Sequence, residues 1–139
     1  MWAIVVGVDG SEHSLRALRF AADLAAQLGD PELLVVFARH AQGLMPPGVD
    51  EAISAPSFDA VEDDARGDVV REMAPRDLRW KFISRTGDPA DVLIAVADEF
   101  DADVVIAGRR AWSNARELLL GSVSNHLVHH CARPVTLVP

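Results

Sequence analysis

The sequence predicts an α/β protein with a single open parallel sheet that carries helices on both faces. Short, nearly continuous apolar runs rich in β-branched residues recur along the chain. Stretches with helical periodicity lie between them, so the predicted order is β-α-β-α-β-α-β-α-β. Parallel strands need helical crossovers, and strands covered on both faces have continuous apolar runs.

The first strand and helix are predicted from the start of the chain. Residues 2–8 form an apolar run that predicts a buried strand, and Asp9-Gly10-Ser11 ends it. From Ser14 onward, leucines and alanines recur at helical spacing. Asp9 or Ser11 can cap this helix, and Gly29 can end it.

The next unit contains a long irregular segment. Residues 33–38 predict a second buried strand. Residues 40–56 hold three prolines and no periodicity, which predicts a flexible excursion or a lid. Residues 58–73 predict a helix, and alternation over 78–83 predicts a strand with one wetter face near a sheet edge.

The last part of the chain repeats the alternation. Asp88-Pro89 starts a helix, because Asp caps free N–H groups and Pro is tolerated at the first helical position. Residues 103–107 predict the fourth strand, 121–132 the fourth helix and 135–138 the fifth strand. The 139 residues show no internal repeat, so one domain over 1–139 is the simplest prediction.

Composition excludes several classes of function. The net charge of -8 disfavours binding to nucleic acid or to anionic lipid. No apolar run approaches the roughly 18 residues of a membrane span. The single cysteine, Cys131, fits a reducing compartment, and Met1 leads into a strand pattern without a signal peptide. We therefore expect a cytoplasmic protein.

The loop after the fourth strand is the strongest indication of a ligand. Gly108-Arg109-Arg110-Ala111 ends that strand, and Gly121-Ser122 follows after nine further residues at a helix start. Glycine permits a close backbone approach or a positive φ, and free N–H groups at a helix start bind phosphate. Arg109 and Arg110 are candidate charge partners for phosphates, although solvated loop arginines are an equally simple interpretation.

The motifs together resemble the universal stress protein family over essentially the whole chain. They are Val5-Val6-Gly7-Val8-Asp9-Gly10-Ser11, Gly87-Asp88-Pro89-Ala90, Gly108-x-x-Ala111 with Gly121-Ser122, and Arg133-Pro134-Val135. The resemblance implies a Rossmann-like sheet of order 3-2-1-4-5, an order that the residue pattern alone leaves open. With that order, the Asp9 turn and the Gly108 loop face one crevice at the carboxyl ends of the strands.

The resemblance also implies a ligand and a dimer. The ligand is ATP or another adenine nucleotide such as AMP or cyclic AMP, with Mg²⁺ accompanying the triphosphate. The fifth strand is the expected edge of the homodimer, because Val135, Leu137 and Val138 are apolar and an edge strand offers unpaired N–H and C=O groups. Asp9 would accept a hydrogen bond from adenine or ribose, and Ala38 would pair with adenine through its backbone. The expected nucleotide-binding residues are Gly7, Asp9, Ala38, Ala107, Gly108, Arg109, Arg110, Ala111, Gly121, Ser122, Val123 and Ser124.

One position departs from the family pattern, because Ala111 stands where the family has a second glycine. Three hypotheses follow. The first is a nucleotide-responsive stress module that is not an enzyme, since no general base, nucleophile or metal cluster is evident. The second is a dimeric interaction protein with a vestigial pocket. The third, a slow nucleotide hydrolase, rests on fold analogy alone.

Other candidate residues have simpler explanations. Ser11 and His13 lie close together at a helix start, but no nucleophile elbow is present. His126 and His130 have the i, i+4 spacing that can chelate a metal, yet they are predicted to lie on a solvated helix face. Cys131 is predicted to be a core residue, and Trp112 has no assigned role.

Overall fold

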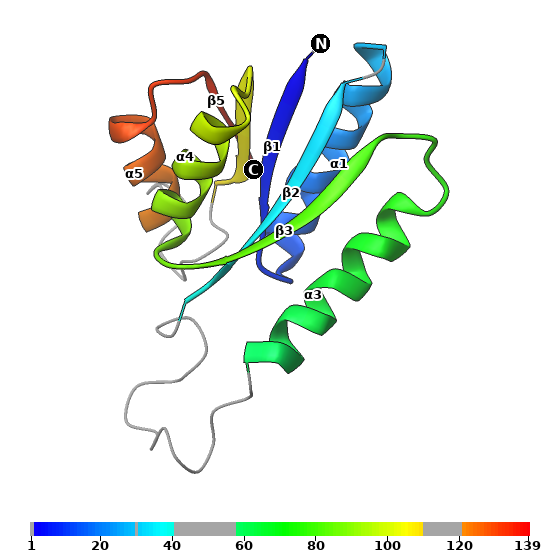
Figure 1. Ribbon diagram of the computed structural model, residues 1–139, viewed down its shortest axis with the longest axis horizontal. Helices are drawn as coiled ribbons and strands as arrows, with labels where there is room; N and C mark the ends of the chain where they lie inside the picture. The colour runs from blue at the N-terminus through cyan, green and yellow to red at the C-terminus, as the bar shows by residue number, and fades with distance from the viewer. Residues whose placement is uncertain (1, 30, 41–57, 110–120) are drawn as a thin grey trace.

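Figure 1 shows a computed structural model in which residues 2–29, 31–40, 58–109 and 121–139 are described. The long loop or lid predicted for 40–56 lies outside these residues, apart from His40. The elements are β1 (Ala3–Val8), α1 (Glu12–Gln27), β2 (Glu32–Arg39), α3 (Phe58–Met73), β3 (Trp80–Thr86), α4 (Pro89–Glu99), β4 (Val104–Gly108), α5 (Ser122–His130) and β5 (Val135–Val138).

The strands form one parallel sheet in the order β3-β2-β1-β4-β5. The predicted fold class and strand order are therefore confirmed. The prediction that residues 78–83 form a more solvent-exposed strand near a sheet edge is also confirmed, because β3 lies at an edge and its residues are half-buried or exposed. In contrast, β1, β2 and β4 occupy the centre and are almost wholly buried.

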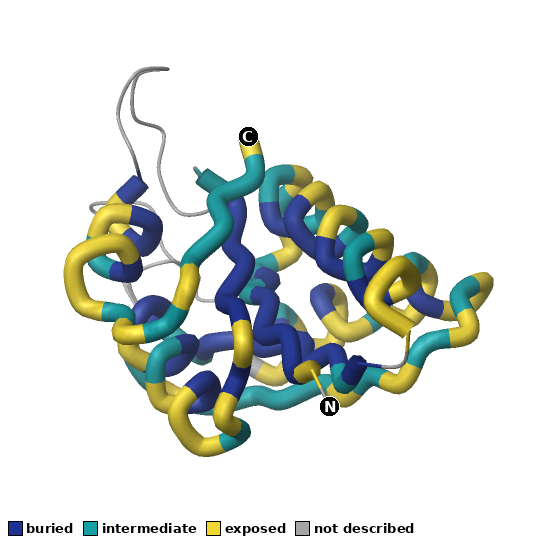
Figure 2. The backbone as a smooth tube through the Cα atoms, turned by 90° about the horizontal axis from the view of Figure 1, so that it is seen from above, coloured by how far each residue is buried: buried dark blue, intermediate teal, exposed yellow. Residues whose placement is uncertain are grey.

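Helices cover both faces of the sheet (Figure 2). Successive side chains of β1 alternate between the cores on these two faces. Ile4, Val6 and Val8 pack in a core beneath α1 and α3. Val5 packs in a second core beneath α4 and α5. Within the described ranges, no helix combines the length and the apolar character that crossing a membrane requires.

Asp9 and Ser11 were both candidates for the cap of α1, and the structure gives them different roles. Ser11 is the cap, because its Oγ accepts a hydrogen bond from the backbone N–H of Ser14 at 3.2 Å. Asp9 lies two residues earlier, where its Oδ1 accepts from the N–H of Ser11 at 2.8 Å. Gly29 follows the helix with a φ of 97°, a conformation that favours glycine.

The helix α4 begins where the Asp88-Pro89 pair predicts. The side chain of Asp88 accepts hydrogen bonds from the N–H groups of Ala90 and Asp91, at 3.1 and 3.3 Å. Pro89, the first helical residue, is buried. Val92, Leu93 and Val96 then face the second core. This cap fixes the helix that covers the carboxyl half of β1 and β2.

We expect Asp88→Ala to lower the free energy of unfolding by about 1 kcal/mol, because two N–H groups lose their acceptor. Asp88→Asn is the matched control, since an Asn side chain caps a helix about as well as Asp. Urea unfolding curves of the two variants and the wild type measure the difference. An equal loss in both variants would contradict a capping role.

Candidate functional site

The candidate site lies where β1 and β4 end. These strands are parallel neighbours, so their carboxyl ends meet at one edge of the sheet. The turn that starts at Asp9 follows β1, and Gly108 closes β4. The structure thus brings together the two loops that the sequence singled out, at the edge where open α/β sheets bind ligands.

The Asp9 carboxylate is held in a fixed position. Its Oδ1 accepts from the N–H of Ser11, while its backbone N–H donates to the Oγ of Ser14 at 3.1 Å. Gly10 adopts a φ of 87° to complete the turn. Among the described residues, the second carboxylate oxygen of Asp9 has no partner and can accept a hydrogen bond from a ligand.

Gly108 is needed for a close approach and not for a positive φ. A Cβ atom at this position would lie 2.9 Å from the backbone carbonyl oxygen of His13 in the first turn of α1. Its φ lies outside the left-handed region. Glycine is therefore required at this position by the packing of α1 against β4, a reason that the sequence did not indicate.

The carbonyl of Arg109 anchors α5 to the end of β4. It accepts from the N–H of Gly121 at 3.1 Å and from the Oγ of Ser124 at 2.9 Å. The N–H of Arg109 donates to the carbonyl of Val138 at 2.7 Å. Arg110 and Ala111 lie outside the described residues.

The first turn of α5 has free hydrogen-bond donors. Gly121 is its N-cap and has no side chain to satisfy them. Asn125 donates to the carbonyl of Gly121, but the N–H groups of Ser122, Val123 and Ser124 have no partner among the described residues. Free N–H groups and the positive end of the helix dipole attract an anion.

Two spaces of different character border this edge. A cavity of about 10 Å³ lies against α4 and is apolar; its lining is Gly7, Val8, Val36, Ala38, Pro89 and Leu93. A cleft of about 510 Å³ lies between the β1–α1 turn and α3. Carboxylates dominate that cleft, whose lining is Asp9, Gly10, Val61, Asp63, Asp64, Ala65, Gly67, Asp68 and Arg71.

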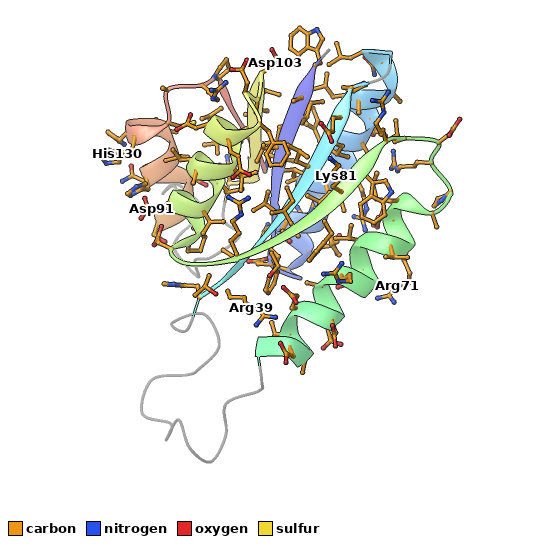
Figure 3. All side chains as sticks on the ribbon, in the orientation of Figure 1. Arg39, Arg71, Lys81, Asp91, Asp103 and His130 are labelled. Carbon is orange, nitrogen blue, oxygen red and sulfur yellow. The ribbon has the colours of Figure 1, made fainter. Side chains whose placement is uncertain are left out.

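Arg39 ties α3 to the end of β2 (Figure 3). Its Nη2 lies 2.9 Å from Glu62 and 2.8 Å from Asp59, both on α3. The hydrogen bonds that the Arg39 guanidinium donates to Glu62 and, to a lesser extent, to Asp59 raise its pKa above the usual value. At the start of α1, a hydrogen bond to Arg19 lowers the pKa of the Glu12 carboxyl.

Three further expected site residues lie on the strands that end at the site. Ala38 and Ala107 are buried at the ends of β2 and β4 and pack in the second core. Gly7 faces α4, where a Cβ would lie 3.0 Å from Leu93. Sequence reasoning missed the place of His13 beside Gly108, because the contact joins segments far apart in the chain.

The histidines of α5 are largely exposed, as predicted. His126 lies 3.0 Å from Asp91 of α4, and its ring centroid lies 4.4 Å from that of His130. Figure 3 labels Asp91 and His130 on this side of the molecule. Across the described ranges, no three His, Cys, Asp or Glu side chains form a group that could hold a metal ion. Cys131 is half-buried and packs against the second core.

Comparison with known proteins identifies relatives along the whole chain. The family model described as the universal stress protein family matches residues 2–139. A universal stress protein of Mycobacterium tuberculosis is 28% identical over 97% of this chain and 94% of the relative. One from Synechocystis is 30% identical over 70 residues, so the match spans 46% of that relative.

A solved structure has the same fold over nearly its full length. It is a universal stress protein in complex with cyclic AMP, and it is 26% identical to this chain. The TM-score is 0.73, and the match covers 99% of this chain and 95% of that one.

We expect Gly108→Ala to lower the free energy of unfolding by about 1–3 kcal/mol, because β4 and α1 must move apart to admit the methyl group. Gly67→Ala is the control. Its Cβ would meet only Arg71, at 3.5 Å, so a gain of up to about 1 kcal/mol from helix propensity is expected. Urea unfolding measures both. A Gly108→Ala variant as stable as the wild type would show that the contact is loose.

Proposed function

This chain belongs to the universal stress protein family, and from that premise we propose that it binds an adenine nucleotide at the carboxyl edge of its sheet. The proposal treats residues 1–139 as one domain that acts as a nucleotide-responsive stress module in the cytoplasm. The single cysteine supports a reducing compartment. The relative solved with cyclic AMP supports the ligand class.

The proposal rests on the first N–H groups of α5, which have no partner among the described residues. Hydrogen bonds to the Arg109 carbonyl place them at the end of β4. The N–H groups of Ser122, Val123 and Ser124 would bind phosphate oxygens. Arg109 would add a positive charge beside them. Gly121, the N-cap, places no side chain over these N–H groups, and Gly108 allows α1 to pack closely against the end of β4.

The base and the ribose would lie toward β1 and β2. The partner-free oxygen of Asp9 would accept a hydrogen bond from ribose or adenine, and Ala38 would offer its backbone at the end of β2. Gly7 and Ala107 would shape the floor of the site. The carboxylates of the α3 cleft repel phosphates, so this polarity favours phosphates at the α5 end.

The proposed ligands are ATP, AMP and cyclic AMP, and Mg²⁺ would arrive with the triphosphate. Arg110 and Ala111 complete the proposed phosphate loop. An alanine costs about 1 kcal/mol relative to glycine where φ is positive, against roughly 8 kcal/mol for a micromolar site. We therefore propose binding that is weakened and not lost.

The proposed role is binding and not catalysis. No hydrogen bond joins Ser11 to His13 among the described residues, so they do not form a nucleophile and its base. A slow hydrolase ranks behind a binding module because it has only the analogy of the fold in its favour.

A second candidate function is a dimeric interaction protein with a vestigial pocket. Its support is the open edge at β5, a four-residue strand whose side chains are half-buried. The helices α1 and α5 flank β5 and expose Phe20 and Val128, at 42% and 51%. An unpaired edge between apolar side chains suits pairing with a second copy.

We expect Asp9→Asn to weaken binding of AMP and cyclic AMP about tenfold or more, because the amide nitrogen cannot accept the ligand's hydrogen bond. The amide oxygen keeps the bond to Ser11, so the turn is preserved. Isothermal titration calorimetry measures the affinities, with Asp23→Asn, a surface carboxylate of α1, as the control. Wild-type protein without affinity at millimolar nucleotide would refute the proposed function.

For the second candidate, we expect sedimentation equilibrium to give twice the 15.0-kDa chain mass without nucleotide. The double variant Phe20→Glu/Val128→Glu should be monomeric, because charges at the paired edge repel each other. Val70→Glu is the control, since Val70 is 47% exposed on α3, a helix that packs against β2 and α1. A monomeric wild type would exclude a dimer through β5.

A further inference from the structure

His13 lies at the candidate site with an unused ring nitrogen. Its backbone carbonyl faces Gly108 across the close approach of α1 and β4. The Nδ1 atom of His13 is shielded from solvent and has no hydrogen-bond partner among the residues that the structure describes. Leaving a buried polar atom unpaired is unfavourable, so such atoms call for an explanation.

Arg109 has a second nitrogen of the same kind. Its Nε is shielded from solvent and lacks a partner in the described part of the chain. Within the described ranges, the guanidinium of Arg109 also has no carboxylate partner, in this strongly acidic chain. Carboxylates pair with the side chains of Arg19, Arg39, Arg71, Arg76, Arg85 and Arg133.

The two unpartnered nitrogens belong to neighbouring parts of the structure, because His13 contacts Gly108 and Arg109 follows Gly108 in the chain. A Cβ at Gly108 would lie 3.4 Å from the Cβ of His13, so the imidazole starts next to the end of β4. Arg109 is the next residue, and its carbonyl holds the first turn of α5. Both side chains therefore start beside the free N–H groups that the proposed function assigns to phosphate.

We propose that His13 contacts phosphate, with its Nδ1–H and the Nε–H of Arg109 donating hydrogen bonds to phosphate oxygens of a bound adenine nucleotide. This inference rests on the proposed function and adds a residue from α1 to the phosphate site. The Nε–H of arginine is always a donor, the Nδ1 of histidine donates when it carries a proton, and the oxygens of an ionised phosphate accept. A bound phosphate would satisfy two nitrogens that have no partner among the described residues.

Two substitutions of His13 show whether its side chain acts as a hydrogen-bond donor or only occupies space. His13→Asn keeps a nitrogen bonded to Cγ, in the place of Nδ1, whereas His13→Gln keeps a larger polar side chain without one. We expect Gln to weaken AMP binding about 10- to 100-fold, the effect of losing a charge-assisted hydrogen bond, and Asn to retain most of the affinity. His129→Gln, on the exposed face of α5, is the control.

The ligand series shows whether the effect arises at phosphate. Isothermal titration calorimetry with adenosine, AMP and ATP should give an unchanged adenosine affinity for His13→Gln and weaker binding of both phosphorylated ligands. For Arg109, Arg109→Gln keeps an N–H at the ε position and Arg109→Met removes it, so Met should cause the larger loss for AMP. Urea unfolding of each variant without ligand verifies that it is folded.

Three outcomes would overturn the inference. Equal weakening of adenosine and AMP by His13→Gln would make His13 a positioning residue. Unchanged AMP binding in both His13 variants would show that its nitrogen is not used. If the wild type bound neither adenosine nor AMP, the proposed function would fail together with this inference, whereas normal wild-type binding with either of the first two results would leave that function intact.

Discussion

The site depends on the close contact between Gly108 and the backbone of His13. Strand order makes it possible, because β1 and β4 are neighbours and the helix that follows β1 starts beside the end of β4. Two hydrogen bonds to the Arg109 carbonyl then fix α5 against the same point. The first turns of α1 and α5 thus meet one strand end, and any side chain at position 108 would separate them.

The uneven charge distribution favours one orientation of a ligand in the site. The protein is acidic overall, and the cleft between the Asp9 turn and α3 is lined mainly by carboxylates. At the opposite end, the first N–H groups of α5 and the guanidinium of Arg109 have no partner and no carboxylate neighbour, respectively, within the described part of the chain. An elongated ligand with one anionic end fits this arrangement in one orientation only, since reversal would place its negative charge among like charges.

The sequence predicted local structure better than the contacts between elements. Helix 58–73 and strand 135–138 match α3 and β5, because Pro75 and the apolar run are local signals. The order of the strands came from family resemblance, since periodicity does not say which strands pair. Likewise, the reason for glycine at 108 and the unpaired nitrogen of His13 depend on α1 and β4 meeting, which no local pattern encodes.

The departure at Ala111 has a limited effect if the phosphate donors are spread over several elements. In our proposal these donors come from α5, from Arg109 and from His13 of α1, and none of them depends on the side chain at 111. Hydrogen bonds to charged groups contribute about 1.5–3 kcal/mol each, more than the roughly 1 kcal/mol difference between glycine and alanine at a positive φ. A site with donors on three elements therefore tolerates one imperfect loop residue, whereas a site built on the loop alone would not.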